Sequence, residues 1–430
     1  MQCKLPYGDS GYNLEYPDEK IKGILEGVPM KSAVSEEAEV RRAMQNPVDS
    51  APLSQLVKKG EKVCIIIGDV TRLWVRNHIL LPPILDELNK GGVADSDILI
   101  VSATGDHRDQ TGEEHRKLVG EEVYRRIKIV DHRARADAEV VKVGTTSYGN
   151  EVLINRNVVE ADRVILTGGI VYHFLAGWGG GKKAIIPGVA GYRTIMNNHT
   201  LALNPEPGQG GINPAVRAGK LEGNPCSDDM VQGASLVKPD FLVNSVINES
   251  EHKIALVVAG NYLTAFNHGC RFVDRHMGVK IEETAALVIA SCGGYPKDID
   301  FYQTYKTIYN AHFALKKGGT LILLSESREG MGNADYASIF SAYDNNAGRE
   351  AALRKSFTIG GYMGYHTAMI ASENRVLALT DLDEQRVARM GMIKVNSIKA
   401  ALEYAVKENG GELPGAYIMP YGGTTLPLPG

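Results

Sequence analysis

The stretch "KVCIIIGD", residues 62–69, decides the fold class. Its apolar residues are continuous rather than alternating, which is typical of a strand buried on both faces of a parallel sheet. A helical pattern follows in residues 80–92 and ends in Gly-Gly, which suits a helix terminus. Two more such strands occur at "DILIVSATG" (97–105) and "ADRVILTGG" (161–169). This alternation predicts an α/β fold with helices on both faces of a mostly parallel sheet.

The same alternation of apolar strands and helical patterns starts again near residue 278. "TAALVIASCGGYP" (284–296) is followed by a helical pattern and by further apolar strands. We therefore predict two domains with a cleft between them. We place them at 1–272, rejoined by the C-terminal segment 410–430, and at 278–408.

Composition excludes several classes of protein. The chain has 430 residues, 47 Lys plus Arg, 51 Asp plus Glu and a net charge of −4. No basic surface for nucleic acid or an anionic membrane is expected. No apolar run approaches the roughly 20 residues that span a bilayer. The polar N-terminal stretch "MQCKLPYGDSGYN" shows no signal-peptide pattern, and the five scattered cysteines form no CxxC pair. These features predict a cytoplasmic protein with reduced thiols.

Polar residues follow several of the predicted strands. "GDVTR" (68–72) brings Asp69, Thr71 and Arg72, "SATGDHR" (102–108) brings His107, and "TGGIVYH" (167–173) brings His173. In open parallel sheets, ligands bind beyond the carboxyl ends of the strands. We therefore expect these side chains to share one site.

Three histidines have competing interpretations. His107 and His173 at equivalent strand ends could supply a base on each face of one carbon, as a racemase needs, or could be satisfied structural residues. His199, at the end of a predicted helix, could be a metal ligand or could contact helix carbonyls.

The glycine-rich loop "GWGGGKK" (177–183) is a near miss for a phosphate-binding P-loop. The glycine spacing is one residue short, and Lys183 stands where a hydroxyl would bind magnesium. The loop could hold a mononucleotide phosphate on its backbone amides or could be a packing turn with solvated lysines. We expect Lys182 or Lys183 to face inward, lose its proton more easily and act as a nucleophile.

Taken together, these stretches resemble the lactate racemase family, whose members use a nickel-pincer nucleotide. Nearly the whole chain takes part in the resemblance. The matching motifs, in the family's order, are "DVTR" (69–72), "ATGDHR" (103–108), "HFLAGWGGGKKAIIPG" (173–188), "YRTIMNNH" (192–199) and "GGYPKDIDFYQTYK" (293–306).

The resemblance implies a cofactor, a reaction and roles for particular residues. The cofactor is pyridinium-3,5-bisthiocarboxylic acid mononucleotide nickel, tethered through a thioamide to Lys183 and bound at its nickel by His199. His107 and His173 would be the acid–base pair of a 2-hydroxy-acid racemase or epimerase that works by reversible hydride transfer. Cofactor contacts would come from the N-terminal domain, at Asp69, Val70, Thr71 and Arg72. Substrate contacts would come from Arg72, Tyr302, Gln303, Lys306 and Tyr362. The implied partners are the small 2-hydroxy acid and, transiently, cofactor-synthesis enzymes.

Three positions depart from the lactate enzymes of the family. Val70 replaces a histidine, Lys182 replaces an arginine, and Tyr362 replaces a tryptophan of the lactate pocket. The changes at Val70 and Tyr362, with Arg76 as an extra cation, favour an acid larger or more polar than lactate. The alternatives are a lactate racemase proper, a metal-independent two-base racemase and a non-catalytic nucleotide-binding protein.

Overall fold

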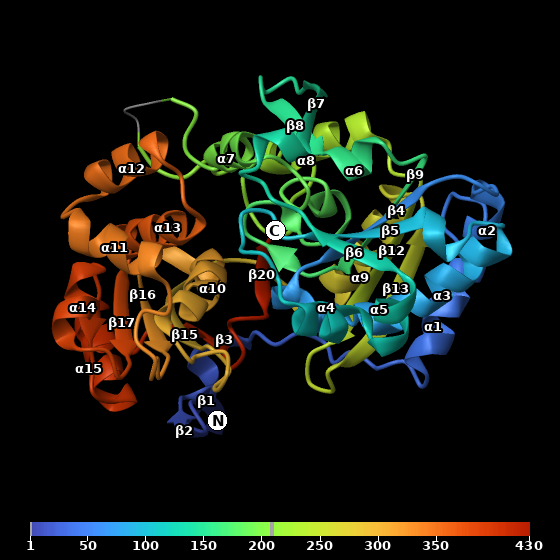
Figure 1. The fold of residues 1–430 in the computed structure, drawn as a ribbon. Helices are drawn as coiled ribbons and strands as arrows, with labels where there is room; N and C mark the ends of the chain where they lie inside the picture. Colours follow the sequence, from blue (N-terminus) through green and yellow to red (C-terminus); the bar gives the residue numbers. More distant parts are fainter. Residues whose placement is uncertain (1, 207–209) are drawn as a thin grey trace. The chain divides into compact units, whose positions relative to one another are not determined.

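A computed structural model describes residues 2–206 and 210–430. The chain divides into two compact units. The first contains the described residues of 1–28, 206–212 and 275–430, and the second contains 29–205 and 213–274 (Figure 1). Among the described residues, no helix combines the length and apolar character required to cross a membrane.

The second unit is built on a six-stranded sheet in the order β13-β12-β9-β4-β5-β6. All neighbours are parallel except the edge strand β13, which is antiparallel to β12. The opening stretch forms the central strand β4, in which residues 63–67 are each at most 1% exposed, and this confirms the predicted buried strand. The strands are β4 (Val63–Gly68), β5 (Ile98–Ala103), β6 (Lys128–Asp131), β9 (Arg163–Gly169), β12 (Phe241–Asn248) and β13 (Lys253–Gly260).

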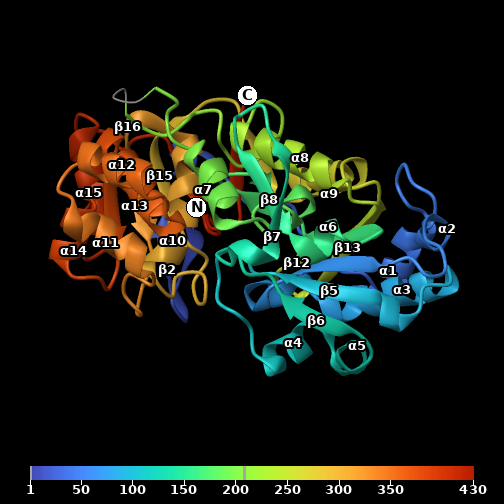
Figure 2. The ribbon, with the colours of Figure 1, turned by 45° about the horizontal axis from the view of Figure 1, so that its top comes forward.

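Four helices cover one face of this sheet. Their apolar side chains, such as Leu80 and Leu118, form one buried cluster with Ile65 and Ile100 of the strands. Figure 2 shows two of these helices, α4 and α5, beside β6. The four are α1 (Glu36–Gln45), α3 (Asn77–Lys90), α4 (Gly112–Val119) and α5 (Glu121–Arg126).

The remaining elements of the second unit include two hairpins and the segments that carry the candidate site. The hairpins are β7 (Val140–Thr145) with β8 (Glu151–Asn155), and β10 (Tyr172–His173) with β11 (Gly177–Trp178). The helices are α2 (Leu53–Leu56), α6 (Arg156–Val159), α7 (Tyr192–Thr200), α8 (Pro225–Val237) and α9 (Thr264–Met277), with the 3₁₀ segments η2 (Val70–Val75), η3 (Asp95–Asp97), η4 (Asp137–Glu139) and η5 (Gly181–Ala184).

The first unit has its own six-stranded sheet, entirely parallel, in the order β18-β17-β16-β15-β19-β3. Helix α15 and the hairpin β1–β2 cover one face, where Leu5 and Leu14 join Ile289 and Ile418 in a buried cluster. The strands are β1 (Gln2–Tyr7), β2 (Ser10–Glu15), β3 (Ile21–Ile24), β14 (Gly278–Ile281), β15 (Ala285–Ser291), β16 (Leu315–Leu324), β17 (Arg375–Leu379), β18 (Ile393–Lys394), β19 (Ala416–Met419) and β20 (Leu426–Pro429). The helices are α10 (Phe301–Ala311), α11 (Ala334–Ala342), α12 (Asn346–Lys355), α13 (Ile359–Glu373), α14 (Glu384–Arg389) and α15 (Ile398–Glu408), with η1 (Asp18–Lys20) and η6 (His312–Ala314).

Both units therefore have the predicted α/β class, but the chain is shared between them differently from expectation. We expected residues 410–430 to rejoin the N-terminal domain and residues 2–28 to belong to it. In the structure, both segments belong to the first unit. The physical reason is that β19 lies inside the sheet, hydrogen-bonded to β15 on one side and to β3 on the other.

Candidate active site

Three loops of the second unit follow neighbouring parallel strands. The order β9-β4-β5 brings the carboxyl ends of these strands to one edge of the sheet. Asp69 follows β4, His107 follows β5, and His173 follows β9. The strand order therefore accounts for the shared edge that the sequence predicted.

Asp69 and His107 form a close pair. Asp69 is 4% exposed, and its Oδ2 lies 2.5 Å from Nδ1 of His107, while Thr71 donates its backbone N–H (3.2 Å) and its hydroxyl (2.5 Å) to Oδ1. Burial alone would raise the pKa of Asp69, but the hydrogen bonds from His107 and Thr71 outweigh it and the pKa is lowered. Asp69 is therefore an ionised carboxylate that orients the imidazole of His107.

A polar network that the sequence did not reveal supports the start of η2. Gln110 accepts the backbone N–H of Val70 at 2.6 Å and donates to Ser102 and, at 3.0 Å, to Asp131. Asp131 is the last residue of β6, so collecting polar residues at every strand end would have found it. The backbone N–H of Val70 is thus bonded within the protein.

His173 lies in the β10–β11 hairpin, opposite Gly177. Its Nδ1 accepts the backbone N–H groups of Leu175 at 3.1 Å and Ala176 at 3.3 Å. Its Nε2 lies 2.8 Å from Nζ of Lys183. Burial is the main cause that holds the pKa of His173 well below its ordinary value of 6.5, so the ring is neutral.

The two lysines of the loop occupy different environments. Lys182 is 1% exposed, donates to the carbonyl of Ala176 at 3.1 Å and lies over the ring of Phe266 at 4.8 Å. Burial lowers its pKa to about 8. For Lys183, burial followed by the charges of Arg72 and Lys182 lowers the pKa to about 7. Lys183 therefore contacts His173, whereas Lys182 packs into the protein.

The glycine-rich loop is a packing turn in this structure. Gly180 has φ +79° and Gly181 has φ +53°, and a Cβ at these positions would lie 2.6 Å from Asn244 and 2.7 Å from Phe266. The amide of Gly181 donates to Asn244 at 2.8 Å, and those of Gly179 and Lys183 donate to backbone carbonyls. These three amides have protein acceptors, so the loop presents Lys183 rather than a P-loop cradle.

Arg72 connects the two histidine pairs. Its guanidinium is exposed, and its charge lowers the pKa of Asp69 on one side and of His173 and Lys183 on the other. An exposed guanidinium near both histidine pairs could bind a carboxylate with its two N–H groups. Arg76, which we expected to add a second cation, instead pairs with Glu36 at 2.7 Å and donates to the carbonyl of His252 at 3.1 Å.

His199 lies near the end of α7 and is 1% exposed. Burial, followed by the charge of Lys183, lowers its pKa to about 3. The helix is anchored beside it because Asn198 donates to the buried carboxylate of Asp229 at 2.8 Å. Asp229 also accepts from Asn150 at 2.9 Å and Thr146 at 2.5 Å.

The four other predicted substrate residues lie in the first unit. Asp300 caps α10 by accepting the backbone N–H of Gln303 at 2.7 Å, and the side chain of Gln303 accepts from Lys306 at 3.1 Å. The ring of Tyr302, on the same helix, meets that of Tyr336 edge-on, with centroids 5.9 Å apart. Tyr362 on α13 is 1% exposed, and its ring stacks on that of Phe357 with centroids 5.6 Å apart.

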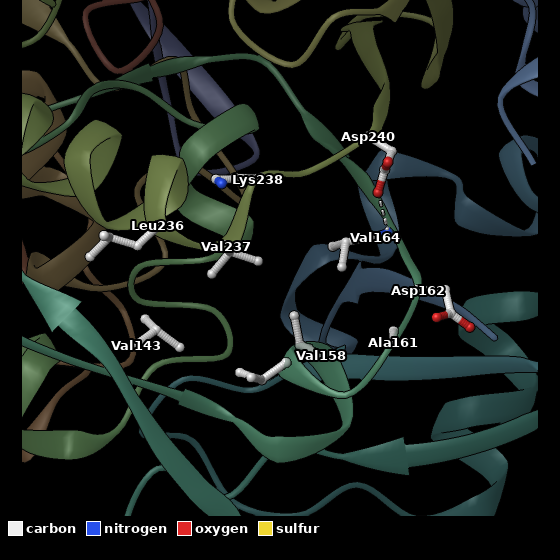
Figure 3. A pocket seen from close by; sticks show the side chains of 10 residues that line it. Val143, Val158, Ala161, Asp162, Val164, Leu236, Val237, Lys238 and Asp240 are labelled. Carbon is white, nitrogen blue, oxygen red and sulfur yellow. Dashed lines mark hydrogen bonds between the residues drawn. The ribbon is translucent and has the colours of Figure 1, made fainter. Parts of the chain in front are cut away.

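A cavity of about 310 Å³ lies at the other end of the second unit's sheet, away from all these residues. Figure 3 shows its lining, with Val164 at the start of β9 and valines of β7 and α6 around it. Asp240 accepts the backbone N–H of Val164 at 2.8 Å and a guanidinium N–H of Arg163 at 2.9 Å. None of the candidate acid–base residues is among the residues that line this cavity.

Comparison with known proteins decides the family. A family model described as the lactate racemase N-terminal domain matches residues 7–210, and one described as the lactate racemase C-terminal domain matches residues 280–422. The lactate racemase of Lactiplantibacillus plantarum is 31% identical over 418 residues, which cover 94% of this chain and 95% of that protein. The chain belongs to the lactate racemase family.

A second relative and two solved structures agree with this family and fold. The lactate racemase of Thermoanaerobacterium thermosaccharolyticum is 36% identical over 335 residues, 77% of this chain and 76% of that protein. The apoprotein structure of the lactate racemase from that organism superposes with a TM-score of 0.88 at 32% identity and full coverage of both chains. A Thermotoga maritima protein, at TM-score 0.60 and 18% identity over 94% of this chain and all of its own, shares the fold alone. As a member of the lactate racemase family, the chain is an isomerase of the racemase type.

Proposed function

We propose that the chain racemises or epimerises a 2-hydroxy acid by reversible hydride transfer, with His107 and His173 as its acid–base pair. The observation that carries this proposal is that the protein holds the two imidazoles in opposite tautomers. Ionised Asp69 needs a proton on Nδ1 of His107, so Nε2 of a neutral His107 has a lone pair. Two amide donors need a lone pair on Nδ1 of His173, so its Nε2 carries the proton.

This arrangement presents one proton acceptor and one proton donor. In one direction, His107 removes the proton of the substrate hydroxyl as the bond between C2 and hydrogen breaks. A planar 2-keto acid then turns over, and His173 returns a proton to its oxygen when hydrogen returns to the other face. For this transfer His173 must first take up a second proton, because loss of Nε2–H from the neutral ring would leave an imidazolate. In the reverse direction the two histidines exchange roles. The side chain of His107 is 52% exposed, so solvent reaches its imidazole.

The residues present fit the implied nickel-pincer nucleotide. An anionic nucleotide suits the exposed guanidinium of Arg72, which lies close enough to lower the pKa of Lys183, the residue that would tether it. Among the residues that the structure describes, no group of three or more His, Cys, Asp or Glu side chains could hold a metal. His199 would therefore supply a single ligand, and the cofactor's own sulfur and carbon atoms would supply the others.

Each side chain would then have a definite task. Lys183 would tether the cofactor, His199 would bind its nickel, and residues 69–72 would contact it from η2. When bound, that group would accept the C2 hydrogen as a hydride. The C2 hydrogen is too weakly acidic for a histidine to remove it as a proton. Arg72 would hold the substrate carboxylate, with Gln303 and Lys306, Tyr302 and Tyr362 as further substrate contacts. Cofactor-synthesis enzymes would be transient partners.

For the substrate, we propose an acid larger or more polar than lactate. Tyr362 adds a phenolic hydroxyl where lactate enzymes carry tryptophan, and Val70 replaces a histidine beside the cofactor. Arg76 no longer supports this preference, because Glu36 neutralises it. We therefore expect kcat/KM to be lower for lactate than for a longer or more polar 2-hydroxy acid.

One experiment tests the function. The chain is expressed with the cofactor-synthesis enzymes, and loss of optical rotation is followed for lactate, malate and gluconate, with kcat/KM for each. For the substrate that reacts, deuterium at C2 should give a primary isotope effect and remain in the product, and His107→Ala and His173→Ala should each abolish turnover in both directions. Loss of deuterium to water would establish direct proton abstraction instead. A preference for lactate would overturn only the substrate assignment.

A further inference from the structure

The contact between His173 and Lys183 has a direction. A protonated lysine has no lone pair and can only donate, so it needs a bare nitrogen on its partner. The amides of Leu175 and Ala176 occupy the lone pair of Nδ1 and leave the proton on Nε2, the atom that lies 2.8 Å from Nζ. A hydrogen bond over this distance therefore requires Nε2–H to donate to a neutral amine.

The surroundings of Lys183 agree with a neutral amine. Lys183 faces Arg72 of η2, Lys182 of η5, Cys226 of α8 and His199 of α7, besides His173 of β10. No carboxylate among the described residues forms an ion pair with it. Every charged neighbour is thus a cation, which disfavours a further positive charge on Nζ.

We infer that His173 holds Lys183 as a free amine in the cofactor-free protein, and that acylation of Lys183 then releases Nε2–H of His173 for catalysis. This inference rests on the proposed tether at Lys183. The histidine would act twice: first as the positioning residue of cofactor loading, then as a hydrogen-bond donor to the substrate oxygen.

The loading step balances without an oxidant or a reductant. The amine adds to the carbon of a thiocarboxylic acid, a C–N bond forms and the C–O bond breaks. Oxygen leaves as water with one hydrogen from the amine and one from the thioacid, and the product is a thioamide. A thioamide nitrogen is a very poor acceptor, so Nε2–H loses its partner and can donate to substrate.

The tautomer can be read directly. The two ring nitrogens of a neutral imidazole differ widely in ¹⁵N chemical shift according to which carries the proton. In cofactor-free protein labelled at histidine, the signals of His173 are assigned by their loss in His173→Gln. We expect a bare Nδ1 and a protonated Nε2, with the opposite pattern for His107. A protonated Nδ1 on His173 would overturn the inference.

The state of the amine is tested by competitive labelling with acetic anhydride across pH, read by mass spectrometry at each lysine. Lys183 should be acetylated at lower pH than the exposed Lys399, whose side chain is 87% exposed. In His173→Leu, which lacks an N–H donor, the midpoint for Lys183 should rise by about one pH unit. In His173→Gln, whose side-chain amide can still donate, the midpoint for Lys183 should rise less. His107→Leu is the matched control and should leave the midpoint in place.

An unchanged midpoint in His173→Leu would show that His173 does not hold the amine neutral. These measurements use no cofactor, so they separate the inference from the proposed function. If the co-expressed protein carries no nucleotide mass on Lys183, the tether is wrong, whatever the midpoints show. If the tether forms equally fast in His173→Leu and in the unsubstituted chain, the loading role of His173 is wrong while the tether stands.

Discussion

At the scale of single residues, the two histidines differ in what holds Nδ1. A carboxylate holds it in His107, and two backbone amides hold it in His173. A carboxylate also stabilises the imidazolium that forms when His107 accepts a proton, whereas amide donors oppose a proton on Nδ1. In the proposed reaction, His107 would therefore serve as the proton acceptor, whereas His173 would act through Nε2–H.

Asp69→Asn tests the base. The amide keeps the size of the side chain but loses the charge that orients and stabilises the protonated ring of His107. We expect kcat to fall on the order of 10²–10⁴, measured as optical rotation with the best substrate of the panel. Asp106→Asn, one residue before His107, removes only an exposed partner of Arg135 and should leave kcat unchanged. A similar loss in both variants would contradict the role of Asp69.

The sequence could predict which residues gather here, but not their hydrogen bonds. Asp69, His107 and His173 follow apolar strands, and parallel strands bring such positions to one edge. The tautomer of His173 depends on the amides of Leu175 and Ala176, whose direction is set by a short turn that no residue pattern specifies. The spacing of the glycines suggested a phosphate cradle. The sequence could not show that this loop packs on Asn244 and Phe266, because these residues come from distant parts of the chain.

At the scale of elements, α7 depends on one buried carboxylate. Asp229 of α8 accepts from Asn198 on α7, from Asn150 and from Thr146. Asp229→Ala leaves these buried donors without their acceptor and should lower the free energy of unfolding by roughly 2–5 kcal/mol. The measurement is urea denaturation. The adjacent Asp228→Ala removes only a partly exposed carboxylate, so a change within about 0.5 kcal/mol is expected, and equal losses would contradict the anchoring.

Two buried histidines make the first unit sensitive to acid. His366 of α13 bonds Tyr305 at 2.9 Å, and His312 bonds the carbonyl of Tyr309 at 2.5 Å. Burial lowers the pKa of His366 to about 3 and that of His312 to about 4, from an ordinary value of 6.5. Below pH 6.5 the unfolded chain therefore binds protons that the folded chain does not. Each histidine should cost about 1.4 kcal/mol of stability per pH unit as the pH falls from 6.5 towards 4.

Urea midpoints between pH 7 and pH 4 check this dependence. His366→Gln should reduce the slope of stability against pH, because one differential proton is removed. The exposed His268→Gln should leave the slope as it is. A slope that does not change in His366→Gln would show that His366 is protonated in the folded protein.

At the scale of the whole molecule, the chain is not divided in sequence order. The alternation of strands and helices predicted two α/β units, but it could not assign residues 2–28 or 410–430. Short apolar segments such as "IKGI" (21–24) and "AYIM" (416–419) fit any parallel sheet equally well. Their place is decided by strands far along the chain: β3 joins the sheet by pairing with β19, and β19 pairs in turn with β15.

This division predicts that residues 275–430 do not fold alone. Without residues 2–28, β19 becomes an open edge, and the cluster on one face of the sheet loses Leu5, Leu14 and Tyr16. We expect the isolated fragment to aggregate or to lack a cooperative urea transition. The same fragment followed by a flexible Gly/Ser linker and residues 2–28 restores strand β3 and the β1–β2 hairpin, and should unfold cooperatively. A linked fragment in which Leu5 and Leu14 are both changed to Asp is the control for burial, and should fail like the isolated fragment. A cooperative transition in residues 275–430 alone would show that this unit folds without the N-terminal segment.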